Sequence, residues 1–190
     1  MTRCRSEEGG VQTELVTAAR DGDADAFAAL ARLSSDRLFA VALRVTRDRH
    51  RAEDALQQTL IAVWKELPRL RDPERFDAWT YRLVVRFAVQ EARGGRRPIR
   101  EMHVVPERDP SLDDATGDVE QRDQLERGFE RLTPEQRAVV VLHFYAGLGL
   151  AEIADTIGVP LGTVGSRLHY AKRALRAALE ADDRDEVRTA

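Results

Sequence analysis

One stretch near the C-terminal end, residues 151–175, restricts the possible folds more than any other part of the chain. Ile153 and Ile157 lie four residues apart on one face of a first helical pattern, and Gly158 then supplies the left-handed backbone that ends a helix. Pro160 prevents that helix from continuing. A second pattern follows, with apolar residues at helical spacing: Val164, Leu168, Ala171, Leu175 and Leu179. Two helices that meet at a tight turn form a helix-turn-helix, and an αα-hairpin of a helical bundle is the alternative.

The second helix of this stretch has a basic outer side. Thr163, Ser166, Arg167, Tyr170 and Arg173 lie opposite its apolar residues. Between Thr163 and Arg176 there are four basic residues and no acidic one. A helix with this charge is suited to lie against the phosphates of DNA.

The composition is that of a soluble, folded protein. Of the 190 residues, 43% are hydrophobic and 33% are charged, which is typical of a globular chain. The net charge of −3 argues weakly against nucleic acid, but residues 98–124 alone hold three basic and eight acidic residues. Cys4 is the only cysteine, so no disulfide can form within the chain, and we expect a reducing compartment. No apolar run approaches the roughly 20 residues of a membrane helix, which predicts a cytoplasmic protein.

Helical periodicity also fills the first half. We expect helices before the turn at residues 21–23, up to about Leu33, from about Leu38, over 52–67 and over 76–93, with a charged loop at 69–75. The helix at 52–67 has the clearest pattern, with apolar spacings of three and four that define one buried stripe. The expected stripe is Ala52, Ala55, Leu56, Leu60, Val63, Trp64 and Leu67, and the expected polar side is Glu53, Asp54, Gln57, Gln58, Ala62 and Lys65.

Helical order is lost at residues 98–124 and returns at Leu125, and Thr133 and Pro134 then give a strong helix start. No strand pattern appears in the sequence. The predicted fold is all-α, with two small helical domains joined by a flexible acidic linker, and the C-terminal domain holds the helix-turn-helix. The predicted boundaries are a disordered leader at 1–12, a first domain at 13–97, the linker at 98–124, a second domain at 125–180 and a tail at 181–190.

Together, the two halves resemble the extracytoplasmic-function (ECF) sigma factors, the smallest class of bacterial transcription initiation factors, over about residues 15–179. The stretch from Ala52 to Trp64 is similar to the family's region 2.2, and the stretch from Phe76 to Leu83 is similar to the start of its promoter-melting helix. Residues 132–137, 152–154, 162–164 and 166–168 are similar to region 4. A helix-turn-helix alone is a weak signal for this family. A region 2-like segment followed, across a short linker, by a region 4-like segment is a specific one. The resemblance implies an alternative sigma factor that binds core RNA polymerase, directs it to specific promoters and assists promoter melting.

The resemblance implies three contact surfaces. In the family, the polar face of the region 2.2 helix docks on a coiled coil of the polymerase β′ subunit, and the loop and helix that follow hold the −10 element with one base extruded. Region 4 reads the −35 element as duplex, and core polymerase supplies both β′ and β subunits as partners. The implied core contacts are Asp54, Gln57, Gln58 and Lys65. The implied −10 contacts are Arg69, Arg71, Arg75, Tyr81, Arg82 and Arg86. The implied −35 contacts are Thr163, Ser166, Arg167, Tyr170, Lys172, Arg173 and Arg176.

Within these sets, Ser166, Arg167 and Tyr170 are the leading candidates for base edges and nearby phosphates, and Lys172, Arg173 and Arg176 for the DNA backbone. Trp79 has the spacing of a core residue. The chain departs from the family pattern at several positions that bear on the promoter sequence, namely Gln58, Leu60, Arg86, Gly149, Gly165 and Tyr170.

Other interpretations stay open at the level of sequence. The polar face at 52–67 also suits a solvated surface helix. A stand-alone helix-turn-helix regulator, with the first half as a sensor or dimerisation domain, is the alternative function. The four histidines lack metal-ligand spacing and no Gly-rich phosphate loop exists, so we expect no enzyme, no cofactor and no metal. An anti-sigma factor is implied by the resemblance alone. The linker either repels DNA or folds back on the basic faces.

Overall fold

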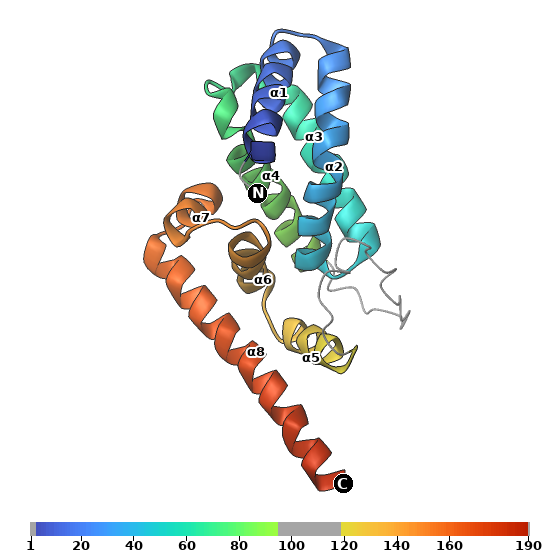
Figure 1. The fold of residues 1–190 in the computed structure, drawn as a ribbon, viewed down its shortest axis with the longest axis vertical. Helices are drawn as coiled ribbons and strands as arrows, with labels where there is room; N and C mark the ends of the chain where they lie inside the picture. The colour runs from blue at the N-terminus through green and yellow to red at the C-terminus, as the bar shows by residue number, and fades with distance from the viewer. Residues whose placement is uncertain (1–2, 95–118, 190) are drawn as a thin grey trace.

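The computed structural model describes residues 3–94 and 119–189, and within these ranges the chain is helical without strands (Figure 1). The first range contains α1 (Arg3–Arg20), α2 (Ala24–Thr46), α3 (Arg49–Glu66) and α4 (Phe76–Gly94), with the short 3-10 turns η1 (Leu67–Arg69) and η2 (Pro73–Arg75) between α3 and α4. The second contains α5 (Val119–Glu130), α6 (Pro134–Val140), the π-helical turn η4 (Val141–Tyr145), α7 (Leu150–Ile157) and α8 (Leu161–Thr189). The all-α prediction with two helical halves is confirmed.

The first half is a four-helix bundle in which α2, α3 and α4 pack on one another and α1 packs on α2. Asp23 caps α2 by accepting hydrogen bonds from the backbone N–H groups of Asp25 and Ala26 at 2.9 and 3.0 Å. The sequence predicted two helices where the structure has the continuous α2. In its middle Ser34 is buried, and the Ser35 hydroxyl donates to the Ala31 carbonyl at 2.6 Å, which satisfies that serine within the helix.

Three helix ends differ from the predicted boundaries. Helix α1 begins at Arg3, inside the expected leader, and α8 continues to Thr189, through most of the expected tail. Helix α5 begins at Val119, within the expected linker, and the rest of that linker up to residue 118 lies outside the described residues. Once packed residues have nucleated a helix, each added residue costs little free energy, so polar flanks with no apolar pattern can still be helical.

The second half begins with the predicted cap. The Thr133 side chain accepts from the Gln136 backbone N–H at 3.3 Å, and the Gln136 side chain accepts from the Thr133 N–H at 2.9 Å. Gly158 ends α7 at φ 69°, the left-handed conformation expected of it. Helix α8 turns Val164, Leu168 and Ala171 inward, where all three are buried. The helix-turn-helix is therefore present as predicted.

The two halves also pack against each other. Helices α6 and α7 and the turn η4 lie against α2 and α4 (Figure 1). One cluster of buried residues crosses the boundary: it includes Val41, Val45 and Val84 of the first half and Val139 and Leu142 of the second. A separate cluster around Leu30, Leu67 and Phe76 fills the far end of the first half. The sequence did not predict this contact between the halves.

Candidate polymerase and promoter interfaces

Helix α3 is rotated relative to the face that its sequence pattern predicted. Trp64, expected in the buried stripe, is 51% exposed, and Ala62, expected on the polar side, is buried. Ala52, Ala55, Val63 and Leu67 are buried as predicted, and Thr59 and Ala62 complete a buried line made mostly of small residues. The Thr59 hydroxyl donates to the Ala55 carbonyl at 2.7 Å, which satisfies it inside the core. Small side chains let α3 approach α2 and α4 closely, and this close approach leaves the larger apolar residues nearer the surface.

These displaced apolar residues form an open hollow of about 430 Å³ between α2 and α3. The Phe27 ring meets the Trp64 ring edge to face, with their centroids 4.7 Å apart. The hollow is lined by Phe27, Leu56, Leu60, Ile61 and Trp64, with Glu53 and Gln57 as its polar members. Exposed large apolar side chains with a polar rim are typical of a protein interaction site.

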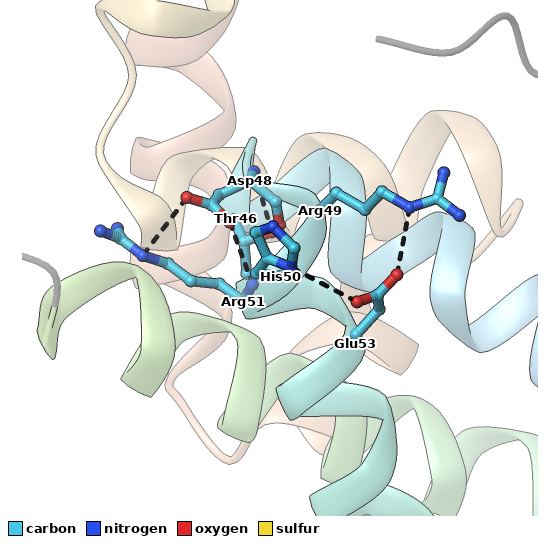
Figure 2. A network of polar contacts seen from close by, with 6 residues as sticks. All are labelled: Thr46, Asp48, Arg49, His50, Arg51 and Glu53. Atoms are coloured by element: carbon cyan, nitrogen blue, oxygen red, sulfur yellow. Dashed lines mark hydrogen bonds and ion pairs between the residues drawn. The ribbon is translucent and has the colours of Figure 1, made fainter. Parts of the chain in front are cut away.

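The first turn of α3 holds one of these rim residues in place (Figure 2). Asp48 caps the helix by accepting from the Arg51 backbone N–H at 3.0 Å, and the Thr46 hydroxyl donates to the Asp48 carbonyl at 3.0 Å. Arg49 Nε donates to Glu53 Oε1 at 3.1 Å, and His50 Nδ1 lies 3.6 Å from Glu53 Oε2. Glu53 is therefore oriented by Arg49 and His50, which directly follow the cap residue Asp48 on the same helix.

The four residues implied as core-polymerase contacts separate into two groups. Asp54, Gln57 and Lys65 are exposed on α3, and Gln57 lines the hollow directly. Asp54 and Lys65 do not line the hollow: at about 100° per residue they lie on the side of α3 next to Ile61, at the border of the hollow. Gln58 instead donates to Glu91 Oε1 of α4 at 2.7 Å and is partly buried. Its amide is used within the bundle.

The loop between α3 and α4 carries three of the implied −10 contacts. Leu67 and Phe76, each almost fully buried, anchor its two ends. Arg69, Arg71 and Arg75 lie exposed between these anchors. The basic groups therefore project from a short segment with two fixed ends.

Helix α4 is fixed at its start by one carboxylate. The Asp77 carboxylate accepts hydrogen bonds from both terminal guanidinium nitrogens of Arg37, at 2.6 and 3.0 Å, and from the Gln12 side-chain amide, at 2.6 Å. This network ties α1, α2 and α4 together directly after the arginine loop. It was not found in the sequence because the three residues are 25 or more positions apart and follow no motif.

Of the remaining implied −10 contacts, Arg82 and Arg86 are exposed on α4, but Tyr81 is only 6% exposed. The Arg37 guanidinium carbon lies 5.3 Å from the centre of the Tyr81 ring. Burial raises the pKa of Tyr81 above its usual value, although Arg37 acts in the opposite direction. In this structure the Tyr81 ring belongs to the packed interior and offers no surface for a base. Trp79 is partly buried, with its ring centre 6.1 Å from that of Phe76, as its spacing predicted.

The implied −35 contacts follow α8. Ser166, Tyr170 and Arg173 are exposed at spacings of four and three, which makes one line along the outer side of the helix. Thr163 and Arg167 are partly buried beside it. Lys172 is rotated about 140° from Arg167, and its Nζ lies 5.9 Å from the centre of the Phe144 ring. Arg176, one turn after Lys172, is exposed.

Comparisons with known proteins follow the same division of the chain. The Sigma-70 region 2 family model matches residues 30–97, and the Sigma-70 region 4 model matches residues 122–175. The chain is 36% identical over 173 residues to the ECF RNA polymerase sigma factor SigL of Mycobacterium tuberculosis, which covers 84% of this chain and 94% of SigL. The chain belongs to the ECF RNA polymerase sigma factors.

Other relatives agree with this assignment. The ECF sigma factor SigE of Mycolicibacterium smegmatis is 34% identical over 154 residues, and the match spans 77% of this chain and 59% of SigE. Among solved structures, CnrH in complex with the cytosolic domain of CnrY aligns with a TM-score of 0.65 at 24% identity, over 90% of this chain and 99% of that one. RpoE of Bartonella quintana in complex with the anti-sigma factor NepR aligns with a TM-score of 0.54 at 22% identity, over 79% and 94%. These two structures support the fold.

As an ECF sigma factor, the protein is an initiation factor that directs RNA polymerase to promoters. The Sigma-70 region 2 match explains the first half of the chain as part of a sigma factor. A stand-alone helix-turn-helix regulator would need a separate explanation for that half. Within the described ranges, no three His, Cys, Asp or Glu residues gather as metal ligands. Among the helices of these ranges, none is long and apolar enough to span a bilayer.

Proposed function

We propose that this sigma factor binds core RNA polymerase through the hollow between α2 and α3. The observation that carries this proposal is the exposure of Trp64 and Ile61 beside Gln57 on a helix whose other side is buried in the bundle. An open apolar hollow with a polar rim of Glu53 and Gln57 is the kind of surface that receives a helix of a partner protein, and the proposed occupant is a helix of the β′ coiled coil. Asp54, Gln57 and Lys65 are the polar contacts of this surface. Gln58 contributes by holding α3 to α4 through Glu91.

The proposal for the promoter assigns the loop at 67–76 and α4 to the −10 element. The non-template strand, from which one base is extruded, is surrounded by the positive charge of Arg69, Arg71, Arg75, Arg82 and Arg86, as single-stranded DNA binding requires. Tyr81 supports this surface from the interior by packing against Arg37. Stacking with a base from Tyr81 would need a rearrangement of α4.

For the −35 element, the proposal places the outer line of α8 in the major groove. Ser166 and Tyr170 are then nearest the base edges, and Arg173 and Arg176 reach the phosphates. Thr163 and Arg167 flank this line. Lys172 lies on the side of Phe144, where it reaches only a phosphate at the edge of the groove.

The proposal also covers an anti-sigma partner, the location of the protein in the cell and the absence of catalysis. The fold relatives include proteins solved with CnrY and with the anti-sigma factor NepR, which supports an anti-sigma partner for this chain as well. Action on promoter DNA together with polymerase places the protein in the cytoplasm. The protein carries no catalysis of its own in this proposal, because polymerase performs the chemistry.

The core-binding surface is tested with the double variant Asp54→Ala and Gln57→Ala. We expect at least a tenfold weaker affinity for core polymerase, measured by fluorescence anisotropy of the labelled full chain, because two polar contacts of about 1 kcal/mol each are lost. Asp155→Ala, an exposed acid on α7, is the matched control and should bind normally. Normal binding by the double variant would remove the role assigned to this face. Run-off transcription that shows no stimulation over core enzyme would remove the sigma function altogether.

A further inference from the structure

Helix α1 supports the loop at 67–76, which carries three of the proposed −10 contacts. It packs on both turns of that loop, η1 and η2, as well as on α2. Val16 of α1 is fully buried in the same cluster as Leu67 and Phe76, the two anchors of the loop. The Sigma-70 region 2 model begins at residue 30, so α1 precedes the matched part of the chain, and the match gives this helix no role.

One polar side chain of α1 reaches the end of this loop. Gln12 Nε2 donates a hydrogen bond to Asp77 Oδ1 at 2.6 Å. Asp77 directly follows Phe76 and lies in the first turn of α4. Both partners are partly buried, which strengthens the hydrogen bond relative to one in open water. The Gln12 amide therefore fixes α1 to the residue at which the loop becomes helix.

Arg37 of α2 holds the same carboxylate with both terminal guanidinium nitrogens. Its Nη1 donates to Asp77 Oδ2 at 3.0 Å, and its Nη2 donates to Oδ1 at 2.6 Å. The Arg37 Nε is buried without a hydrogen-bond partner in the described part of the chain, so this guanidinium depends on Asp77 for its acceptors. Burial acts to lower the pKa of Arg37, but the hydrogen bonds and the charge of Asp77 outweigh burial and hold the pKa above its usual value. A bidentate pair of this kind fixes orientation as well as distance.

The positions of the loop arginines depend on this network. Arg71 and Arg75 are exposed, and Arg75 lies only two residues before Asp77, whereas Arg82 lies on α4 itself. A tilt or rotation of the first turn of α4 would therefore displace these guanidinium groups relative to one another. Binding groups are effective when their supporting residues hold them within about 0.5 Å of the productive geometry. A loop that samples several positions would still attract any single strand by charge, but would hold none in a single register.

We propose that Gln12, Arg37 and Asp77 are positioning residues for the −10 element. They hold the loop at 67–76 and the start of α4 in the geometry that receives the promoter strand in one register. The three side chains act through the arginines and need no contact with DNA. This role rests on the proposed function of the loop and of α4. Helix α1 thereby takes part in promoter recognition, although it lies before the matched region.

The test measures how well the holoenzyme, assembled from core polymerase and the full chain, discriminates the −10 sequence. Fluorescence anisotropy compares two labelled single strands: the non-template strand of a promoter mapped by transcript sequencing, and the same strand with its −10 segment scrambled. The ratio of the two affinities does not depend on the fraction of active protein, so a merely structural defect leaves it unchanged. We expect Gln12→Leu to lower this ratio about fivefold, because one hydrogen bond is lost, and Asp77→Asn to lower it about tenfold, because the charge that holds both partners is lost.

The matched control is Glu14→Leu, at an exposed position of the same helix, which should change neither this ratio nor the affinity for core polymerase. Gln12→Leu leaves the pair of Arg37 and Asp77 in place, so it decides the test if Asp77→Asn fails to fold by circular dichroism. An unchanged ratio in each folded variant overturns the positioning role, and so does an equal fall in Glu14→Leu. A wild-type holoenzyme that shows no preference for the promoter strand contradicts the proposed −10 surface itself, and the positioning role with it.

Discussion

At the scale of single residues, two glycines of similar appearance in the sequence have opposite roles. Gly128 of α5 faces α8: a Cβ there would lie 2.9 Å from Leu175 Cδ2 and 3.3 Å from Ala178 Cβ. Gly165 of α8 has nothing within 4 Å of the same position. Both are helical, so only the neighbouring packing distinguishes them.

This difference predicts opposite effects for the same substitution. Gly165→Ala should stabilise the protein by about 0.5–1 kcal/mol, because alanine is the better helix former and meets no neighbour. Gly128→Ala should destabilise it by about 1 kcal/mol or more, because overpacking against Leu175 exceeds the gain in helix propensity. Thermal denaturation followed by circular dichroism should show melting temperatures shifted by roughly 2–4 °C in opposite directions. A higher melting temperature for Gly128→Ala would contradict the packing of α5 on α8.

Glu135 makes a residue-scale prediction about pH. Burial acts to raise its pKa, but hydrogen bonds from its own backbone amide and from Arg93 outweigh burial and hold the pKa below the usual value. A lowered carboxyl pKa stabilises the folded protein at neutral pH, and this contribution is lost as the pH falls through the folded pKa. Glu135→Gln should therefore lose less stability than the wild type between about pH 5 and pH 3 in urea denaturation. If the free energy of unfolding falls equally with pH in both proteins, the Glu135 carboxylate does not contribute to stability at neutral pH.

Residue by residue, the sequence predicted well wherever local signals determine the conformation. The caps at Thr133 and Gly158 and the inward line of Val164, Leu168 and Ala171 depend on near neighbours, and all are present. Trp64 and Tyr81 depend on distant contacts. Periodicity placed Trp64 inside, but the small residues Ala55 and Ala62 occupy the core of the bundle and leave it exposed.

At the scale of elements, α3 combines two functions on one helix. Its small residues fasten it to the bundle and its large apolar residues line the hollow. Stability and binding should thus be separable by substitution. Resemblance implied a polar docking face here, whereas the apolar part of the surface became visible only from the packing.

Trp64→Ala tests this separation. Half of the Trp64 side chain is already exposed, so the loss of stability should be about 1–2 kcal/mol, less than the 3–5 kcal/mol typical of a buried tryptophan. Core-polymerase affinity should fall at least tenfold, since aromatic side chains dominate interface energies. Ala55→Val, which crowds the buried line, should give the reverse pattern: a clear loss of stability in urea, with near-normal affinity of the folded fraction for core. Equal losses of stability and binding in both variants would show that the two sides of α3 do not act separately.

Helix α8 makes a second prediction at this scale. Arg173 lies on its outer line, whereas Lys172 lies beside Phe144. Arg173→Ala should lower promoter affinity of the holoenzyme and reduce the slope of log affinity against log salt by about one. Lys172→Ala should change the slope less. The promoter duplex for this measurement comes from promoters mapped by sequencing transcripts after induced expression. A larger change of the salt slope for Lys172→Ala than for Arg173→Ala would mean that the DNA major groove lies on the Phe144 side of α8.

At the scale of the whole molecule, the two halves share one buried cluster although they match two separate family models. The sequence predicted independent domains because the segment between them lacks a helical pattern. Nothing in either half marks Val45, Val85 or Val139 as residues that meet across the boundary, since each fits the core of its own half equally well. The contact between the halves is therefore a property that only the three-dimensional structure reveals.

This shared cluster predicts how the free protein unfolds. Two domains on a tether would melt in separate transitions, whereas halves that bury one cluster together should melt in one cooperative transition. Calorimetry of the full chain should show a single peak whose calorimetric and van't Hoff enthalpies agree. Glu135→Arg weakens the contact between the halves without touching either hydrophobic interior, so it should split or broaden this peak, and the exchange with Arg93→Glu should restore it. Two well-separated peaks in the wild type would mean that the halves are energetically independent, so that the shared cluster contributes too little free energy to couple their unfolding.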